Sequence, residues 1–596
     1  MHYNMRHTTR HIAQLLVIVL LLALGVAPAF SASADDWSEP AAFYSADTAV
    51  FTAATLDDDL VAQVNSLLAQ LPLDLELFGL PTSAEELLYE LSPRDSFDGG
   101  TYDETFAWVG DWIAVGTADF SQDFSFANDS STYYTVDVTD REAALTFVRE
   151  ELDERMIISG DAVPFIEEEV DGGTLIYLDL SAVDSPTTAF FQNTYFLGDD
   201  YLIIRPSRID PQSLLDLIAV ESSLSESERF TDAINRLPAD RYNAVAYWDV
   251  AILADTPAIV EAADALAGSP ADYDYPAIFR ALGAQSFGAT ILNDNSLVID
   301  VAANVADPQT LADQGIMLGG SPTLDLAFAD RLPAETPLVL HNTGLGTTVL
   351  AVLETLQQVG DFYDEQQAQG ELDFDEDGLQ FLDAIPVSLE LAFQGLSGAD
   401  LRESLAWMTG DYALFVDLIA NENEGALLPV LPSFGIMIEA TDAAAAADYV
   451  QSAGQILYEL GFTITRDDQQ VVVPFTDAVA QGDDRLDLIF TANADVFTAG
   501  TRPATEAALS ADGGLTTTDS FAQASQLFID DPQFLAYINL EPLTPLVEQL
   551  QSGAFGNDLM IIGMLAPVLE TGSVTASYNE DGSGFARFVL TLGTQE

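Results

Sequence analysis

The second half of this chain repeats, in the same order, short patterns found in its first half, and this repeat is the strongest constraint on the fold. Matched residues stay 291 to 302 positions apart. The pairs are Asp111 and Asp411, Thr139 and Thr441, Arg205 and Arg502, and Phe230 and Phe521. Chance matches do not keep their order at a near-constant offset. The sequence therefore predicts two homologous domains, 35–305 and 325–596, joined by a polar linker, 306–324.

Each repeat carries signals for both helices and antiparallel strands. Thr139-Asp140-Arg141-Glu142 has the form of a capping box and opens a helix expected to reach about Met156. The segment 242–250 is rich in β-branched and aromatic residues, and 286–305 and 573–592 are typical of β-hairpins. Because helices and strands alternate irregularly, we expect an α+β fold. Each of the two tandem domains would be a mostly antiparallel sheet with helices packed on one face.

Residues 1–34 have the pattern of a secretory signal peptide. Arg6 and Arg10 precede an almost wholly apolar stretch, 12–30, and Ala32-Ser33-Ala34 offers the small residues that a signal peptidase accepts. We expect cleavage after Ala34 and a location outside the cytoplasm, secreted or in the cell envelope. The alternative is that the apolar stretch is retained as a membrane anchor.

The charge of the chain is strongly negative. The 596 residues include 96 Asp and Glu, and all 18 basic residues are arginine, so the net charge is −78. Nucleic acids and anionic membrane surfaces are therefore poor partners, because both bind through basic patches. Cations, an envelope polymer or a protein are the partners that this charge leaves open. Such a surface suits high salt, which screens self-repulsion, or an acidic medium, and the sequence does not separate the two.

The repeated pattern resembles a family of uncharacterised bacterial envelope and secreted proteins, domain-of-unknown-function family 3352. The likeness is carried by the two segments in which a Trp and a Gly-Asp pair run into an apolar strand, 108–118 and 407–419, and by the strand–Arg-Pro–helix units. The resemblance implies export and a repeated α+β build. It implies no catalytic residues.

One acidic segment resembles the start of an EF-hand calcium loop. Its Asp-x-Asp-x-Asp-Gly run points alternate carboxylates inward, and calcium prefers such hard oxygen ligands. The loop departs from the pattern at its twelfth position, which holds Ala384 in place of a bidentate Glu. If calcium binds, the ligands are Asp373, Asp375, Asp377, the carbonyl of Leu379, and Asp383. The alternative is a solvated acidic loop, with no cofactor in the chain.

Two further repeated features have both a functional and a structural interpretation. Arg205 and Arg502, each followed by Pro, could clamp a carboxylate, or could simply mark the start of a helix in an acidic setting. Trp108 and Trp407 could form a ligand platform, or could anchor a core beside a glycine turn. We expect the structural role in both cases.

Familiar catalytic chemistry has little support in this composition. The chain has no cysteine and no lysine, and outside the first eleven residues His341 is its one histidine. A Ser-His-Asp triad through His341 lacks the usual nucleophile motif, so we expect a solvated histidine, or one whose hydrogen bonds are satisfied within the fold. We therefore expect a binding or structural role without catalysis. The alternatives are an extracellular hydrolase that acts on glycans through carboxylates alone, and a calcium-stabilised adhesion or scaffold module.

Overall fold

The structure is a computed structural model. The residues that it describes are 37–56, 58–70, 82–84, 107–117, 132–159, 164–179, 193–206, 211–238, 242–266, 273–292, 296–314, 322–334, 336–369, 384–420, 430–467, 469–474, 484–510, 514–543, 569–579 and 581–592.

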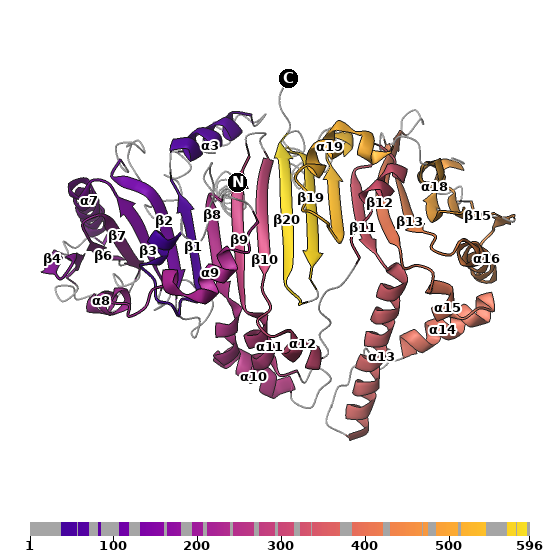
Figure 1. Cartoon of the computed structure of the whole chain (residues 1–596), viewed down its shortest axis with the longest axis horizontal. Coiled ribbons are helices and arrows are strands. Elements are labelled where there is room, and N and C mark those ends of the chain that lie inside the picture. Colours follow the sequence, from indigo (N-terminus) through magenta and orange to yellow (C-terminus); the bar gives the residue numbers. More distant parts are fainter. Residues whose placement is uncertain are drawn as a thin grey trace.

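Twenty strands within the described residues form one continuous antiparallel sheet, which Figure 1 shows along the long axis of the molecule. The first ten, in spatial order, are β4 (Phe165–Val170), β5 (Gly173–Leu178), β6 (Asn193–Leu197), β7 (Tyr201–Pro206), β3 (Thr132–Val138), β2 (Val109–Thr117), β1 (Val50–Thr55), β8 (Ala244–Asp249), β9 (Ala284–Ile291) and β10 (Ser296–Ala303). The sheet continues through β20 (Gly584–Leu592), β19 (Leu569–Tyr578), β18 (Phe534–Asn539), β11 (Leu338–Thr343), β12 (Asp411–Ala420), β13 (Val430–Glu439), β17 (Val496–Thr501), β16 (Leu488–Ala492), β15 (Gln470–Val473) and β14 (Thr465–Arg466).

Helices connect these strands. The α-helices are α2 (Ser38–Ala41), α3 (Asp58–Gln70), α7 (Arg141–Ser159), α8 (Gln212–Ile218), α9 (Glu228–Ile234), α10 (Pro257–Leu266), α11 (Tyr275–Leu282), α12 (Pro308–Asp313), α13 (Leu345–Gln369), α14 (Ala384–Ser397), α15 (Leu401–Leu405), α16 (Ala443–Glu459), α18 (Arg502–Ser510) and α19 (Asp519–Ser525). The 3₁₀ helices are η3 (Leu224–Glu226), η4 (Val250–Asp255), η5 (Leu326–Arg331), η6 (Asp484–Leu486), η7 (Leu515–Thr517) and η8 (Glu541–Leu543).

The spatial order of the strands is the same in the two halves of the sheet, read from each outer end to the centre. The halves meet where β10 pairs with β20, antiparallel to it. The hairpin of β9 and β10 in the first half corresponds to the hairpin of β19 and β20 in the second. Asp300 on β10 and Arg587 on β20 occupy equivalent positions in these two hairpins, and the sheet also pairs them directly with each other. An approximate twofold axis therefore passes through this pair of residues.

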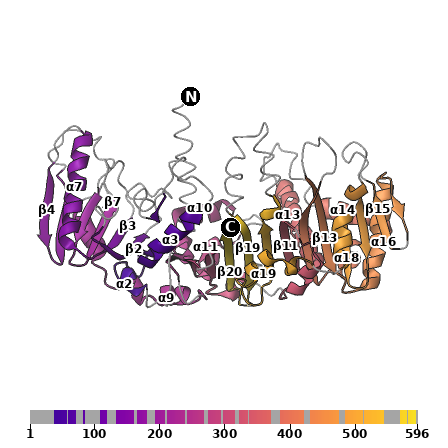
Figure 2. The same cartoon turned by 90° about the horizontal axis from the view of Figure 1, so that it is seen from above.

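The expected α+β class with a mostly antiparallel sheet is confirmed, and two details differ from expectation. The sheet is continuous across both halves, and helices pack on both of its faces instead of one. One face is covered by α2, α8 and α9 in the first half and by η5, α18 and α19 in the second. On the other face, α7 packs near one end of the sheet, and α13, α15 and α16 pack near the other. Figure 2 shows α7 and α13 on the same side of the sheet.

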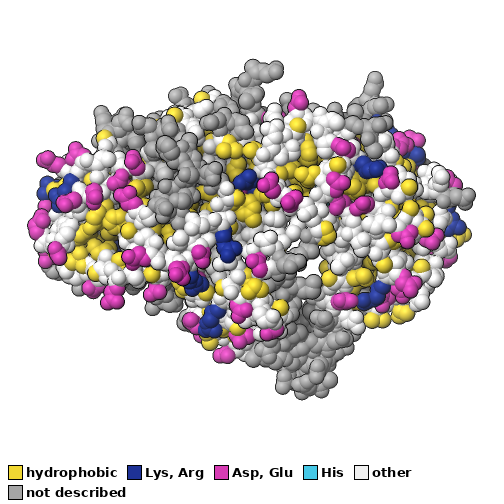
Figure 3. All heavy atoms as spheres, in the orientation of Figure 1, with side chains coloured by type: hydrophobic (Ala, Val, Ile, Leu, Met, Phe, Trp, Pro, Cys, Tyr) yellow, Lys and Arg dark blue, Asp and Glu magenta, His cyan; other side chains and the backbone are white. Residues whose placement is uncertain are grey.

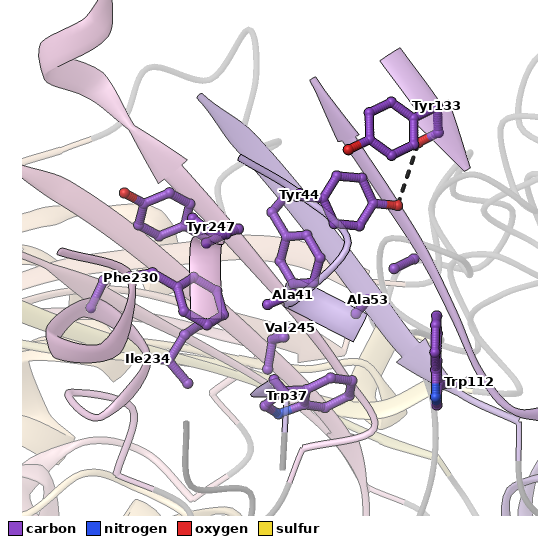
Figure 4. Packing of buried hydrophobic residues seen from close by; sticks show 14 of the residues in the cluster. Trp37, Ala41, Tyr44, Ala53, Trp112, Tyr133, Phe230, Ile234, Val245 and Tyr247 are labelled. Atoms are coloured by element: carbon purple, nitrogen blue, oxygen red, sulfur yellow. Dashed lines mark hydrogen bonds between the residues drawn. The ribbon is translucent and has the colours of Figure 1, made fainter. Parts of the chain in front are cut away.

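Aromatic packing fills the core beneath α2 and α9 (Figure 4). Tyr44 stacks on Tyr133 with ring centroids 4.7 Å apart, and Phe230 meets Tyr247 edge-on at 5.3 Å. The Tyr44 hydroxyl donates a hydrogen bond to Thr135 Oγ1 at 3.1 Å, so its polar atom is satisfied inside the core. Burial raises the pKa of Tyr44 well above its ordinary value, and the phenol stays neutral.

The N-terminus of α7 differs from the predicted capping box. Asp140, and not Thr139, caps the helix, because its Oδ1 accepts from the backbone N–H groups of Glu142 and Ala143 at 3.0 and 3.1 Å. Thr139 instead donates its hydroxyl to the carbonyl of Trp108 at 3.1 Å. The segment expected to be a linker, 306–324, contains α12. Among the described residues no helix is long and apolar enough to cross a membrane.

Candidate functional site

The central part of the sheet buries one face and leaves the other face partly open. Along β1, β8, β18 and β11 the burial alternates residue by residue, as in a sheet with one covered face. The covered face holds such residues as Phe51, Tyr247 and Val339, which are buried beneath the helices. The open face belongs to nine adjacent strands, from β1 through the centre to β12.

The outward side chains of these nine strands include no charged residue, although Asp and Glu make up 96 of the 596 residues. We call this surface the apolar face. Its residues are Val50, Thr52, Ala54, Ala244, Ala246, Trp248, Gln285, Phe287, Ala289, Ile291, Leu297, Ile299, Val301, Ala303, Gly584, Ala586, Phe588, Leu590, Leu592, Gly572, Val574, Ala576, Tyr578, Phe534, Ala536, Ile538, Leu338, Leu340, Asn342, Tyr412, Leu414, Val416, Leu418 and Ala420.

Several large side chains of the apolar face remain in contact with solvent. Trp248, Leu340, Leu414, Ile538, Phe588 and Leu590 are each between 36% and 42% exposed. The strand register places Phe588, Leu340 and Leu414 in one row across the sheet. In order, this row is Ile299, Phe588, Val574, Ala536, Leu340 and Leu414. Other members of the apolar face, such as Ile291, Leu297 and Leu592, are less than 10% exposed, so the exposed part is confined to some of its side chains. Exposed apolar patches are typical of surfaces that bind a ligand or partner.

The opposite side of the molecule has a different surface. In Figure 3, which views the side where α9 and α19 lie in front of the strands, acidic side chains are scattered between hydrophobic patches, and arginines are fewer than acids. This distribution is what a strongly acidic, solvated surface looks like. The absence of charge from the apolar face is therefore a local property and does not reflect the chain as a whole.

Two acidic residues lie where β18 ends and β19 begins, near the Tyr537 hydroxyl of the covered face, since burial and then these two carboxylates raise the pKa of Tyr537. Glu541 follows Ile538 by three residues, and Glu570 stands at the start of β19, next to the pair formed by Leu569 and Leu592. Partial burial, and secondly the nearby Glu541 carboxylate, raise the pKa of Glu570 above its ordinary value. Among the described residues neither carboxylate has a basic partner.

The substitution Glu570→Gln is expected to make stability less dependent on pH. The folded protein holds the Glu570 proton more tightly than the unfolded chain does. The free energy of unfolding therefore falls as pH rises from the ordinary pKa of Glu to the raised pKa of Glu570, because the Glu570 carboxyl ionises in this range. The variant should therefore be more stable than the parent at neutral pH, and equal to it in strong acid. The gain should stay below about 1 kcal/mol because Glu570 is half-exposed. Urea unfolding at several pH values measures it, and a constant difference at all pH values would contradict it.

The repeated Trp and Gly-Asp segments have the same structural role in both halves. Trp108 and Trp407 are each 4% exposed and lie in separate cores. The backbone N–H of Asp111 donates to the Asp137 carboxylate at 2.7 Å, and that of Asp411 donates to the Glu439 carboxylate at 3.2 Å. These tryptophans therefore anchor cores and do not form a ligand platform.

The glycine of each segment makes room for that carboxylate. A Cβ on Gly410 would lie 2.1 Å from Glu439 Oε2, so Gly410→Ala must displace Glu439 and break its bond to Asp411. We expect a loss of about 1–3 kcal/mol in the free energy of unfolding. Gly395→Ala is the matched control. An added Cβ at Gly395 meets nothing within 4 Å, and this glycine lies in helix α14, where alanine is favoured over glycine. It should be neutral or stabilising, and equal losses in the two variants would contradict this role of Gly410.

Arg205 and Arg502 are engaged within their own halves and are not in equivalent positions. Arg205 is buried on β7 and donates to Ser213 Oγ at 2.8 Å. Arg502 opens α18 and donates to the Asp487 carboxylate at 3.0 Å. The turn before β7 in the first half matches the turn before β17 in the second. When the halves are aligned on these turns, Arg205 is equivalent to Gly500, and Arg502 lies two residues further along. The likeness is one of local sequence, and the sheet does not bring these arginines together.

His341 forms a buried pair with an aspartate. Its Nε2 lies 3.1 Å from Oδ2 of Asp411, and its ring stacks on Phe328 at 5.5 Å. The side chain is 1% exposed, and in the described part of the chain Nδ1 has no hydrogen-bond partner. The same position in the first half is Ala53. No described hydroxyl meets the ring to complete a triad, and a substrate could not reach it.

The predicted calcium loop, Asp373, Asp375, Asp377, Leu379 and Asp383, lies outside the described residues. Within the described residues, no group of three or more His, Asp or Glu side chains is arranged to hold a metal ion. The loop therefore remains a prediction.

A buried ion pair joins the two halves at the centre of the sheet. Arg587 donates from Nε and Nη2 to the two oxygens of Asp300 at 2.7 and 2.8 Å, and the Tyr242 hydroxyl donates to the same carboxylate at 2.6 Å. Asp300 is completely buried. This pair lies on the covered face, opposite the apolar face, and its role is to fix how the halves join.

Comparisons with known proteins identify no relative. No family model matches the chain, and the searches of curated proteins and of solved structures find no match. The resemblance to domain-of-unknown-function family 3352 therefore stays a prediction.

Our reading of the sequence missed the apolar face, although a signal for it was present. Strands with one solvated face should alternate apolar and polar residues, whereas in segments such as 297–303 and 585–592 most residues at both alternating positions are apolar, with Asp300, Arg587 and Thr591 as the exceptions. Such strands indicate a sheet that is covered on both faces, or one whose second face binds a ligand.

Proposed function

We propose that this chain is an exported, non-catalytic binding protein of the cell envelope or the cell exterior, and that its apolar face binds an apolar ligand. The ligand would lie across the central strands, against side chains such as Trp248, Phe588 and Leu340. The observation that carries the proposal is the lack of charge among the side chains of the apolar face, although the chain is strongly acidic.

We further propose that the chain consists of two tandem copies of one α+β unit, within the ranges 35–305 and 325–596. The identical strand order of the halves supports this, as do the matching carboxylate bonds at Asp111 and Asp411. Joining two sheets edge to edge produces one surface about twice as wide as either unit could offer. The binding surface is thus a consequence of the pairing of β10 with β20.

The energetics favour a ligand over a bare surface. Burial of apolar area contributes about 25 cal/mol per Å², so covering even part of this face outweighs the cost of immobilising a small ligand. A catalytic role has no comparable support, because no described feature of the apolar face supplies a nucleophile or an acid–base pair. The lining is hydrophobic with few polar groups, as binding sites for small apolar molecules usually are.

Titration of residues 35–596 with Nile red, a neutral dye that fluoresces in apolar surroundings, tests the proposal. We expect saturable binding in the micromolar range, with emission shifted to shorter wavelength. A neutral dye is needed because the protein would repel an anionic one. A linear, unsaturable signal, or none, would contradict the proposal.

A further inference from the structure

We propose that the buried pair of Asp300 and Arg587 selects the partner of each central strand, so that β10 pairs with β20 and neither strand pairs with a second copy of itself. The surface concerned is the junction edge of each half, which is Ser296–Ala303 in the first half and Gly584–Leu592 in the second. Its partner is the unlike edge, in the same chain or in a second copy of the chain. This inference does not depend on a ligand at the apolar face.

The two junction edges are equivalent in detail. The hairpin of β9 and β10 corresponds to the hairpin of β19 and β20 with a shift of 287 residues. The same backbone hydrogen bond closes both turns: the N–H of Leu292 donates to the carbonyl of Ser296, and the N–H of Asn579 donates to the carbonyl of Ser583, each at 2.8 Å. Because the hairpins present the same edge, the backbone alone would let a β10 edge take the place of a β20 edge.

The position of the ion pair decides what a pairing of like edges would bring together. When two copies of one strand pair antiparallel around a twofold axis, only the residue on the axis faces its own copy. In this junction that residue is Asp300 on β10 and Arg587 on β20, because the register pairs them directly. Two β10 edges would therefore place Asp300 against Asp300, and two β20 edges would place Arg587 against Arg587. Like charges directly opposite each other destabilise a sheet, and buried charges without a counter-charge cost more still.

The other pairs of the junction do not discriminate in this way. The register forms eight residue pairs, and the remaining seven, such as Ile299 with Phe588 and Leu297 with Leu590, contain no charged side chain. A pairing of two β10 edges would bring Ile299 against Val301, a contact as apolar as the natural one. The choice between like and unlike edges therefore depends on one ion pair.

Each half also provides a setting that suits only its own member of the pair. In the first half the Tyr242 hydroxyl donates to Asp300 at 2.6 Å, and Gly288 makes room for the tyrosine ring, because an added Cβ would collide with it. In the second half Arg587 donates from Nη1 to the carbonyl of Leu527 at 3.4 Å. The first half thus supplies a donor for a carboxylate, and the second supplies an acceptor for a guanidinium.

Two variants of residues 35–596, Asp300→Arg and Arg587→Asp, test the proposal. Each variant has like charges at its junction, both within one chain and between identical copies. In a reciprocal dimer of the two different variants, the first half of each chain pairs with the second half of the other, and opposite charges meet at both junctions. Every protein in the test carries about 20 inserted Gly and Ser residues between Gly319 and Gly320, so that the halves have the reach to exchange.

The two variants, one of them labelled with ¹⁵N, are unfolded in urea, mixed in equal amounts and refolded. We expect native mass spectrometry to show a dimer with one copy of each variant, at least about tenfold more abundant than dimers of identical copies. The urea midpoint of the refolded mixture should lie above that of either variant refolded alone. A single variant that fails to fold alone leaves the test intact, because the rescue is measured in the mixture.

The doubly exchanged variant, Asp300→Arg with Arg587→Asp, is the matched control. Its own junction has opposite charges, whereas a reciprocal dimer with the parent would place like charges at both junctions. It should therefore form no mixed dimer when it is refolded with the parent. The proposal is overturned if the mixture of single variants behaves as the mean of its components, or if the control forms mixed dimers with the parent as readily. Neither result bears on dye binding, so the proposed function is judged separately.

Discussion

The substitution Asp300→Ala is expected to lower the free energy of unfolding by about 3–5 kcal/mol, the largest effect on stability predicted here. Asp300 is fully buried and accepts two hydrogen bonds from Arg587 and one from Tyr242. Its removal leaves the guanidinium, 19% exposed, without a counter-charge, and leaves the Tyr242 hydroxyl without its acceptor. Because β10 and β20 pair here, the loss falls on the junction of the two halves.

Urea unfolding followed by circular dichroism measures this loss. Arg149→Ala is the control, because the pair that Arg149 forms with Glu167 is equally short but exposed, and such pairs contribute less than about 1 kcal/mol. Unfolding of Asp300→Ala could also separate into two transitions, one for each half, if the junction weakens more than the halves do. Similar losses in the two variants would contradict a special role for the central pair.

Exchanging the central residues, Asp300→Arg with Arg587→Asp, should recover part of the lost stability. The approximate twofold axis places each residue in the position of the other, so the pair can reform in reverse. Recovery should be incomplete, because Tyr242 bonds to the carboxylate only in the natural arrangement. No recovery over the single Asp300→Arg variant would contradict the approximate symmetry at this point.

The second large effect is expected at the apolar face, where Phe588→Asp should weaken Nile red binding about 100-fold or more. Phe588 lies in the middle row of the face and is 42% exposed, so the fold tolerates a polar side chain there. A bound apolar ligand would cover the new carboxylate without pairing it, and burial of an unpaired charge costs several kcal/mol. A loss of about 2.7 kcal/mol corresponds to the 100-fold effect.

Leu391→Asp is the matched control for that variant. Leu391 is also exposed, at 63%, and it lies on α14, outside the apolar face. Circular dichroism and urea unfolding show whether each variant keeps its fold. If both substitutions weaken the binding of dye to the same extent, or if neither does, the ligand does not lie on the apolar face.

Sequence reasoning predicted the class of the fold well because the signals involved are local. The hairpin at 286–305 is β9 and β10, and the helix opened by Asp140 is α7. The Trp and Gly-Asp segments recur with the same bonds because a turn beside a buried indole needs them in each half. These features depend on neighbours in the sequence, which makes them readable without a structure.

The junction and the extent of the apolar face could not be predicted, because both depend on which strands become neighbours. Nothing in the sequence around Asp300 indicates that Arg587, 287 residues away, is its partner. The face becomes a single surface only when nine strands from both halves lie side by side. Long-range pairing of this kind is the part of a fold that local patterns leave undetermined.

Fluorescence quenching at Trp248 tests most directly whether a ligand lies across the central strands. Trp37, Trp108, Trp112 and Trp407 are each at most 7% exposed, whereas Trp248 is 36% exposed and belongs to the apolar face. A neutral maltoside amphiphile with bromine on its tail should quench part of the tryptophan emission. This quenching should disappear in the Trp248→Phe variant. Nile red binding is measured for both proteins in parallel. If this amphiphile binds and the Trp248→Phe variant is quenched as strongly as the parent, the ligand lies elsewhere.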